Sequence, residues 1–189
     1  MQRRVLIVSL ALLAVGSVLA GGKRVTVHVE GVVCPFCTFN LEKRIKTLEG
    51  AAEPLRWQAS IEKGISSFEW KTDVPVDALM IREEIRRAGF TADRVEVALG
   101  GTRAPAARSE VVVVLEALSC EQCSPGVLQS VAGLPGVVRI AVDFDARRMR
   151  ILFAGAAAEA TLIRNTLESA GYVVVAAESS ALPDAAGRP

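Results

Sequence analysis

The sequence predicts an α+β fold in which one β-α-β-β-α-β module, about 70 residues long, is built twice. Three observations lead to this prediction. Strand-like and helix-like stretches follow one another in the same order in both halves. Two Cys-x-x-Cys pairs use all four cysteines, and Cys34 and Cys120 stand 86 positions apart. The segment 134–136 (Leu-Pro-Gly) also matches 48–50 (Leu-Glu-Gly) at the same offset of 86.

The first module opens with a strand over 24–30, where valines alternate with polar residues. A helix follows the first cysteine pair, because an apolar stripe recurs with helical spacing at Leu41, Ile45 and Leu48. Gly50 stands where a helix C-cap is expected. The order is completed by strands over 52–58 and 64–70, a helix over 76–88 and a strand over 94–99.

The second module repeats this order, with a strand over 111–115, a helix striped by Val127, Val131 and Leu134, and strands over 137–143 and 148–153. The stripe of its last helix has the same spacing as that of the first module: Ala160, Ile163, Leu167 and Ala170 against Ala78, Ile81, Ile85 and Ala88. This is the ferredoxin-like plan, so we expect two tandem modules, each a four-stranded antiparallel sheet with two helices on one face.

Residues 1–20 are typical of an export signal: two arginines, an apolar stretch over 5–15 and small residues before Gly21. We therefore expect a periplasmic or secreted mature chain. The alternative is an anchor to the inner membrane by an uncleaved segment over 5–20, although this run is short for a span. The predicted domains are 23–99 and 110–178, joined by a linker over 100–109 and followed by a disordered tail over 179–189.

The charge balance excludes some classes of function. Beyond residue 20 the chain holds 20 Lys and Arg against 21 Asp and Glu. This balance predicts neither nucleic-acid binding nor a polybasic patch for a membrane surface. The sequence contains no phosphate loop, no acid/base constellation and no Ser/His/Asp grouping, so we do not expect an enzyme.

Each cysteine pair stands where the first strand of its module gives way to the first helix. Unpaired backbone N–H groups and the helix dipole favour thiolates there. Two thiolates without a third strong ligand suit a soft ion that accepts two-coordinate geometry, such as Cu(I). A structural zinc site takes four ligands, so zinc would need both modules or an outside donor.

The two loops, 31–37 (Gly-Val-Val-Cys-Pro-Phe-Cys) and 117–123 (Ala-Leu-Ser-Cys-Glu-Gln-Cys), resemble the Gly-Met-x-Cys-x-x-Cys loop of the heavy-metal-associated domain. The Ala-Gly-aromatic endings at Phe90 and Tyr172 are similar too. The resemblance implies one soft ion per module, Hg(II) or Cu(I), bound by Cys34 and Cys37 and by Cys120 and Cys123. With the export signal, it implies the periplasmic mercuric-ion-binding or copper chaperone type. Proteins of that type pass metal to a membrane transporter or to another thiol-bearing carrier.

The loops depart from that pattern at three positions. Val32 and Leu118 replace the methionine, and an aliphatic residue should pack there equally well. Ala117 replaces the loop glycine, which matters if the backbone requires a positive φ. Glu121 would attract a cation to the second pair, so the two sites need not prefer the same metal.

Three other interpretations of the cysteines remain. The pairs could be structural disulfides, or the thiols could be vestigial in an interaction module. The segment 34–37 (Cys-Pro-Phe-Cys) also resembles a thioredoxin-fold active site, so a periplasmic thiol–disulfide oxidoreductase is the main alternative.

Several residues near the pairs carry weaker predictions. We expect the single histidine, His28, to lie on a solvated sheet face. Phe36 and Phe39 either pack over the loop or form an exposed docking patch. Phe90 and Tyr172 are predicted near the cysteine loops. Lys43 and Arg44 are expected on a solvated helix face, with docking as the alternative.

Overall fold

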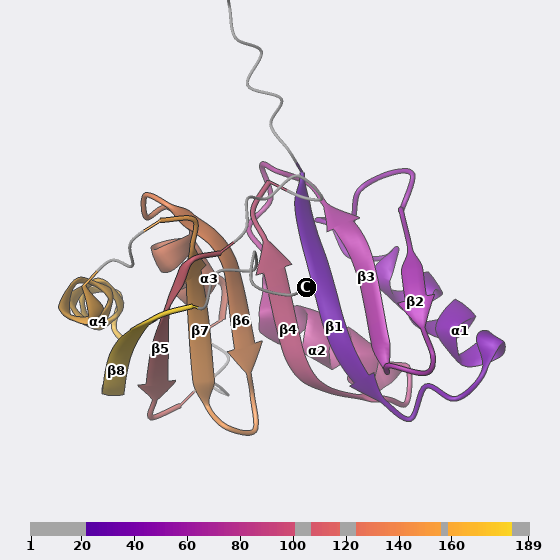
Figure 1. The fold of residues 1–189 in the computed structure, drawn as a ribbon. Helices are drawn as coiled ribbons and strands as arrows, with labels where there is room; N and C mark the ends of the chain where they lie inside the picture. Colours follow the sequence, from indigo (N-terminus) through magenta and orange to yellow (C-terminus); the bar gives the residue numbers. More distant parts are fainter. Residues whose placement is uncertain (1–21, 101–106, 118–123, 156–158, 183–189) are drawn as a thin grey trace, which may run out of the picture.

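The computed structural model describes residues 22–100, 107–117, 124–155 and 159–182. Its first half runs β1 (Lys23–Glu30), α1 (Pro35–Ile45), β2 (Gln58–Ser60), β3 (Ile65–Trp70), α2 (Ala78–Arg87) and β4 (Thr91–Ala98). The second half runs β5 (Ser109–Leu115), α3 (Ser124–Ala132), β6 (Val137–Asp143), β7 (Arg148–Phe153), α4 (Ala160–Ser169) and β8 (Val174–Ala181). The predicted order of elements is therefore confirmed in both halves (Figure 1).

All eight strands belong to one antiparallel sheet, in the order β2-β3-β1-β4-β6-β7-β5-β8. Each half contributes four neighbouring strands in the ferredoxin-like arrangement. The structure differs from the prediction of two separate sheets because β4 pairs with β6, from Arg94 opposite Asp143 to Ala98 opposite Arg139. Both are edge strands of their own halves, and pairing them satisfies N–H and C=O groups that would otherwise face water.

The junction also fixes the direction of the strands. β1 is antiparallel to β4, β4 to β6, β6 to β7 and β7 to β5. It follows that β1 and β5 run in the same direction, as their arrows in Figure 1 show. The carboxyl ends of these two strands therefore lie at the same edge of the sheet.

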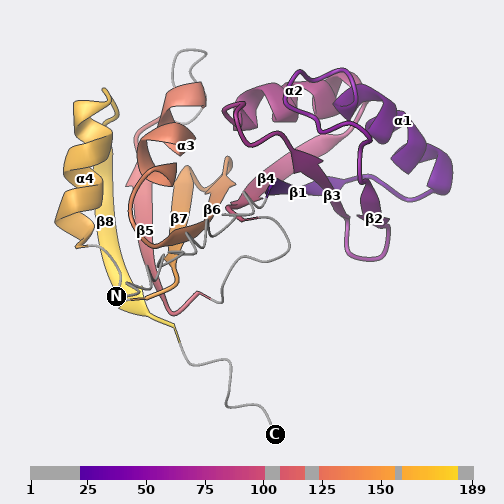
Figure 2. The ribbon, with the colours of Figure 1, turned by 90° about the horizontal axis from the view of Figure 1, so that it is seen from above.

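The helices form one layer in which α1 packs on α2, α2 on α3 and α3 on α4 (Figure 2). The core between this layer and the sheet is mostly aliphatic. The strands contribute alternating valines, and the helices contribute their predicted stripes. The fully buried members include Leu41, Ile45, Ile81, Ile85, Val111, Val113, Ile163 and Leu167.

The other face of the sheet carries polar side chains that pair across strands. Arg24 lies 3.7 Å from Glu69, and Arg150 lies 2.6 Å from Glu110. At the junction Arg94 lies 3.5 Å from Asp143. Pairs of opposite charge on neighbouring strands stabilise an antiparallel sheet while leaving that face hydrated.

Three predicted boundaries differ from the structure. The strand predicted over 52–58 is instead β2 at Gln58–Ser60, because Pro54 has no N–H to donate to a ladder. The tail predicted over 179–189 begins too early, since β8 continues to Ala181 opposite Ser109. Ser109, predicted as linker, is the first residue of β5. None of the helices in the described ranges is long and apolar enough to cross a membrane.

Candidate metal-binding site

Cys34 and Cys37 lie at the amino end of α1, directly after the loop that leaves β1. Cys34 is the N-cap residue of α1, and its Sγ accepts a hydrogen bond from the Cys37 backbone N–H at 3.1 Å. The two Cα atoms are 5.2 Å apart, and the sulfurs are joined as a disulfide. Both side chains therefore converge on one point, where the N–H groups and the dipole of α1 stabilise negative charge on sulfur.

The backbone before the pair explains this placement. Gly31 has φ +83°, a conformation that favours glycine, and it turns the chain away from β1. Val32 is only 6% exposed and packs in the core, so the prediction that an aliphatic residue suits this position is confirmed. Pro35 is in the first turn of α1, where a missing N–H costs no hydrogen bond.

The site is at the surface and is framed by apolar side chains. Cys34 and Cys37 are both half-buried, and Cys37 packs against the core. Val33, Phe36 and Phe39 are 79%, 69% and 59% exposed. The rings of Phe36 and Phe39 stack with their centroids 6.5 Å apart. These rings do not pack over the loop, so the alternative of an exposed apolar patch is the one that the structure supports.

The second pair, Cys120 and Cys123, lies outside the described residues, together with Leu118 and Glu121. The flanking chain shows one difference between the two loops. Arg147 is the only non-glycine residue with positive φ in the described ranges, so Ala117 does not repeat the conformation of Gly31.

The aromatic residues that end α2 and α4 lie near the two helix starts. A side chain at Gly31 would come 3.8 Å from the Phe90 ring. A side chain at Gly126, in α3, would come 2.8 Å from the Tyr172 hydroxyl. Burial raises the pKa of Tyr172 above its usual 10.0. The prediction that Phe90 lies near the first cysteine loop is thus confirmed.

The remaining candidate ligands do not join the first pair. The His28 Nε2 lies 3.3 Å from a Glu96 carboxylate oxygen, across two neighbouring strands of the uncovered sheet face. No group of three or more His, Cys, Asp and Glu side chains in the described part of the chain could hold a metal ion. Within these residues the donor set at the first site is therefore two sulfurs.

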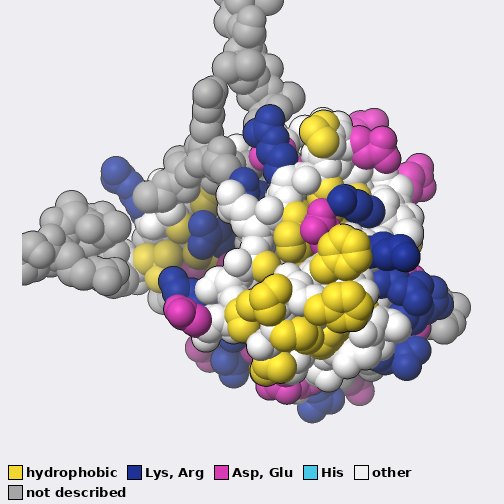
Figure 3. Space-filling model, turned by 90° about the vertical axis from the view of Figure 1, so that its right-hand side faces the viewer, with side chains coloured by type: hydrophobic (Ala, Val, Ile, Leu, Met, Phe, Trp, Pro, Cys, Tyr) yellow, Lys and Arg dark blue, Asp and Glu magenta, His cyan; other side chains and the backbone are white. Residues whose placement is uncertain are grey.

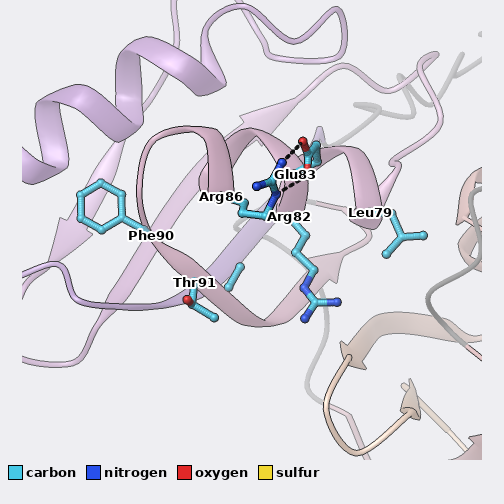
Figure 4. Close-up of a pocket in the computed structure, with 7 residues that line it drawn as sticks. Leu79, Arg82, Glu83, Arg86, Phe90 and Thr91 are labelled. Atoms are coloured by element: carbon cyan, nitrogen blue, oxygen red, sulfur yellow. Dashed lines mark hydrogen bonds and ion pairs between the residues drawn. The ribbon is translucent and has the colours of Figure 1, made fainter.

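A groove of about 490 Å³ runs along α2 and ends beside Phe90 (Figure 4). Its charged side chains are paired within the chain. Arg86 donates two hydrogen bonds of 2.7 Å to Glu83. Arg82 lies 3.7 Å from Asp145 and 4.6 Å from the centre of the Phe144 ring. The groove thus offers a ligand little free charge, and we assign it no binding role.

The fold and this pair define a class: an α+β protein that presents two sulfurs at the amino end of a surface helix. The sequence profile of the heavy-metal-associated domain matches residues 112–173. This match lies in the second half of the chain and agrees with the resemblance noted from its loop. No curated protein matches the sequence.

Among solved structures, the chain is similar to a copper-binding domain from HMA7, a P-type ATPase, with 23% identity and a TM-score of 0.33 over 37% of this chain and 89% of that one. It is also similar to the water-soluble region of the P-type ATPase CopA from Bacillus subtilis, with 14% identity and a TM-score of 0.36 over 82% and 91%. TM-scores this low carry no conclusion about function.

Proposed function

We propose that the protein is an exported, non-enzymatic carrier of soft heavy-metal ions. In this proposal each half acts as a separate module and binds one Hg(II) or Cu(I) ion through two thiolates, Cys34 with Cys37 and Cys120 with Cys123. The convergence of the Cys34 and Cys37 sulfurs at the start of α1 is the observation that carries the proposal. The heavy-metal-associated domain over 112–173 supports it for the second half.

The chemistry follows from the small number of ligands. Metal binding requires the reduced pair, so two external thiols must first supply two electrons and two protons to the disulfide and are themselves joined as a disulfide. A bound ion then has two sulfur ligands, which leaves room for an incoming thiolate to bind before one of the first two leaves. Such an exchange would pass the ion to a membrane transporter or to another thiol-bearing carrier, or let the protein buffer it.

The proposed test is a metal titration of the reduced chain from Gly21 onward, with Hg(II) and Cu(I) in separate series. Two equivalents are expected, with one lost in Cys34→Ser and the other lost in Cys120→Ser. Serine is a strong N-cap residue, so Cys34→Ser removes a thiol while leaving the cap of α1 in place. A single zinc ion shared by four sulfurs would replace this proposal with a bridging site.

The disulfide itself favours a second candidate, a thiol–disulfide oxidoreductase that uses Cys34 and Cys37. In that case the reduced protein would transfer two electrons to a substrate disulfide and return to the oxidised state. Reduction of insulin by the wild-type chain but not by Cys34→Ser would support this candidate. Absence of that activity, together with tight metal binding, would exclude it.

A further inference from the structure

The solvent-facing side of α1 has an unusual composition. Leu41 and Ile45 bury one side of this helix in the core. The opposite side, which we call the α1 outer face, consists of Phe36, Phe39, Asn40, Lys43 and Arg44, all exposed. The outward side of a surface helix is normally polar. Here it carries two phenylalanines and two cations, and no carboxylate.

The cations of the α1 outer face continue onto α2. A groove of about 350 Å³ between the two helices is lined by Asn40, Lys43, Arg44, Thr47, Arg87 and Ala88. Counting the cap residues Lys46 and Asp77, α1 carries three cations and one carboxylate, while α2 carries three arginines and three carboxylates. Glu83 and Glu84 accept hydrogen bonds from the arginines at the end of α2, and Glu84 also lies 3.9 Å from Arg44. The two helices together therefore keep a small excess of positive charge, which comes from α1.

The helices of the second half lack this excess of positive charge. Helix α3 contains no charged residue, and α4 contains one arginine and one glutamate. On the uncovered sheet face Arg24, Arg94 and Arg150 are each paired with a carboxylate. The balanced charge of the whole chain thus conceals a local excess of positive charge. Figure 3, which looks at the α1 end of the molecule, shows hydrophobic side chains gathered on this face with Lys and Arg beside them.

We propose that the α1 outer face, with the basic last turn of α2, docks on an anionic lipid bilayer. The exposed rings of Phe36 and Phe39 are suited to enter the boundary between headgroups and acyl chains. Lys43 and Arg44 meet the negative charge of the lipid headgroups. The inference does not depend on metal binding, and it contradicts the sequence-based expectation that the chain has no basic membrane patch.

A bilayer fits these observations better than an acidic protein does. The two rings project from the surface rather than lining a pocket, and a bilayer needs no matching shape. The cations are spread over the ends of two helices and attract a continuous negative surface. Because Phe36 stands between the two cysteines, docking would also bring the first sulfur pair to the membrane surface.

The test is sedimentation of the reduced chain from Gly21 onward, which contains every described element, with vesicles. One set of vesicles mixes phosphatidylglycerol with phosphatidylcholine, and the other contains phosphatidylcholine alone. Binding is expected only to the anionic vesicles and should weaken as salt rises. Phe36→Ser with Phe39→Ser, and separately Lys43→Glu with Arg44→Glu, should each weaken binding by about tenfold or more.

Matched control variants distinguish vesicle binding through the α1 outer face from nonspecific adsorption. Arg139→Glu with Arg148→Glu makes the same charge change at exposed positions of β6 and β7, away from the α1 outer face. Leu162→Ser with Val175→Ser removes exposed apolar groups from the second half. Both controls should bind vesicles within about twofold of wild type. Equal losses in the controls, or no preference for anionic vesicles, would overturn the proposal. Loss of vesicle binding with unchanged metal stoichiometry in Lys43→Glu with Arg44→Glu would keep the two proposals separate.

A chain that fails to bind vesicles yet still takes up two metal ions would reject the bilayer and leave the metal-binding proposal standing. Conversely, vesicle binding by a chain that takes up no metal would support the bilayer alone.

Discussion

Gly50 shows how a single residue supports the first half. A Cβ at this position would collide with the indole of Trp70, which is buried against Phe68 and donates a hydrogen bond to the Val74 carbonyl at 3.1 Å. Gly50→Ala should therefore displace the indole and lower the free energy of unfolding by about 1–3 kcal/mol. Urea unfolding measures the loss. Gly133→Ala is the control, since a Cβ there would meet nothing within 4 Å.

At the residue scale, the sequence allowed some side-chain environments to be predicted and not others. The buried place of Val32 follows from its position in the loop and its aliphatic character. The exposure of Phe36 and Phe39 does not, because an aromatic residue beside a loop can turn inward or outward with the same sequence. The run of apolar residues at Val32, Val33 and Phe36 was a usable signal, since a short loop cannot bury all three. Cys120 and Cys123 remain predictions.

At the scale of a single element, the start of α2 depends on one side chain. Asp77 is the N-cap residue, and its carboxylate accepts a hydrogen bond from the Met80 N–H at 2.9 Å. Asp77→Ala should lower the free energy of unfolding by about 1 kcal/mol, because the N–H groups of the first turn lose this acceptor. Asp77→Asn keeps a capping oxygen and should remain within a few tenths of a kcal/mol of wild type. Equal losses in both variants, measured by urea unfolding, would mean that the cap is not the cause.

The last turns of α2 carry a titratable network that gives a pH prediction. The hydrogen bond from Arg86 is the largest cause that lowers the pKa of Glu83 to about 2. A lowered pKa in the folded state means that this contribution to stability is present above the usual 4.5 and is lost as the pH falls toward 2. The group is solvent-exposed, so the change in stability should be small. Carboxyl titration by NMR should find the Glu83 midpoint well below 4.5, and Arg86→Gln should raise it.

The elements differ in how well their limits could be predicted. Strands β6 and β7 occupy the predicted ranges, because a turn over 144–147 that contains Asp145 and Arg147 separates two strand-like runs. Strand β2 begins later in the chain than predicted, because a proline interrupts the run of residues on which the prediction was based. The extension of β8 to Ala181 was missed, since its small and polar residues resemble a tail while their backbone pairs with β5. Backbone hydrogen bonds between strands do not depend on residue type, so this pairing could not be predicted from the side chains.

For the whole molecule, the feature that the sequence did not predict is the joining of the two sheets. The order of elements within each half follows from periodicity, yet the choice of partner for an edge strand depends on two distant segments. The strand of the first half that corresponds to β6 is β2, which is short and polar and remains an edge.

This junction predicts that the two halves unfold together. Besides the β4–β6 ladder, Arg82 of α2 stacks on Phe144 and Phe144 donates its N–H to Asp93 at 3.1 Å. Both tryptophans, Trp57 and Trp70, belong to the first half. Their fluorescence should therefore change at the same urea concentration as far-ultraviolet circular dichroism, which reports both halves, as in a two-state transition.

A proline in β6 can separate the two halves. Leu99 donates to Val138 at 2.9 Å and Phe144 donates to Asp93. Since hydrogen-bonded pairs alternate in an antiparallel ladder, the N–H of Val142 also points to β4. Val142→Pro removes that bond and should split the two signals into separate transitions, whereas Val142→Ala removes side-chain atoms only and should weaken the protein while keeping the signals coincident. Two separate transitions in the wild-type chain would show that the halves are not coupled through β4 and β6.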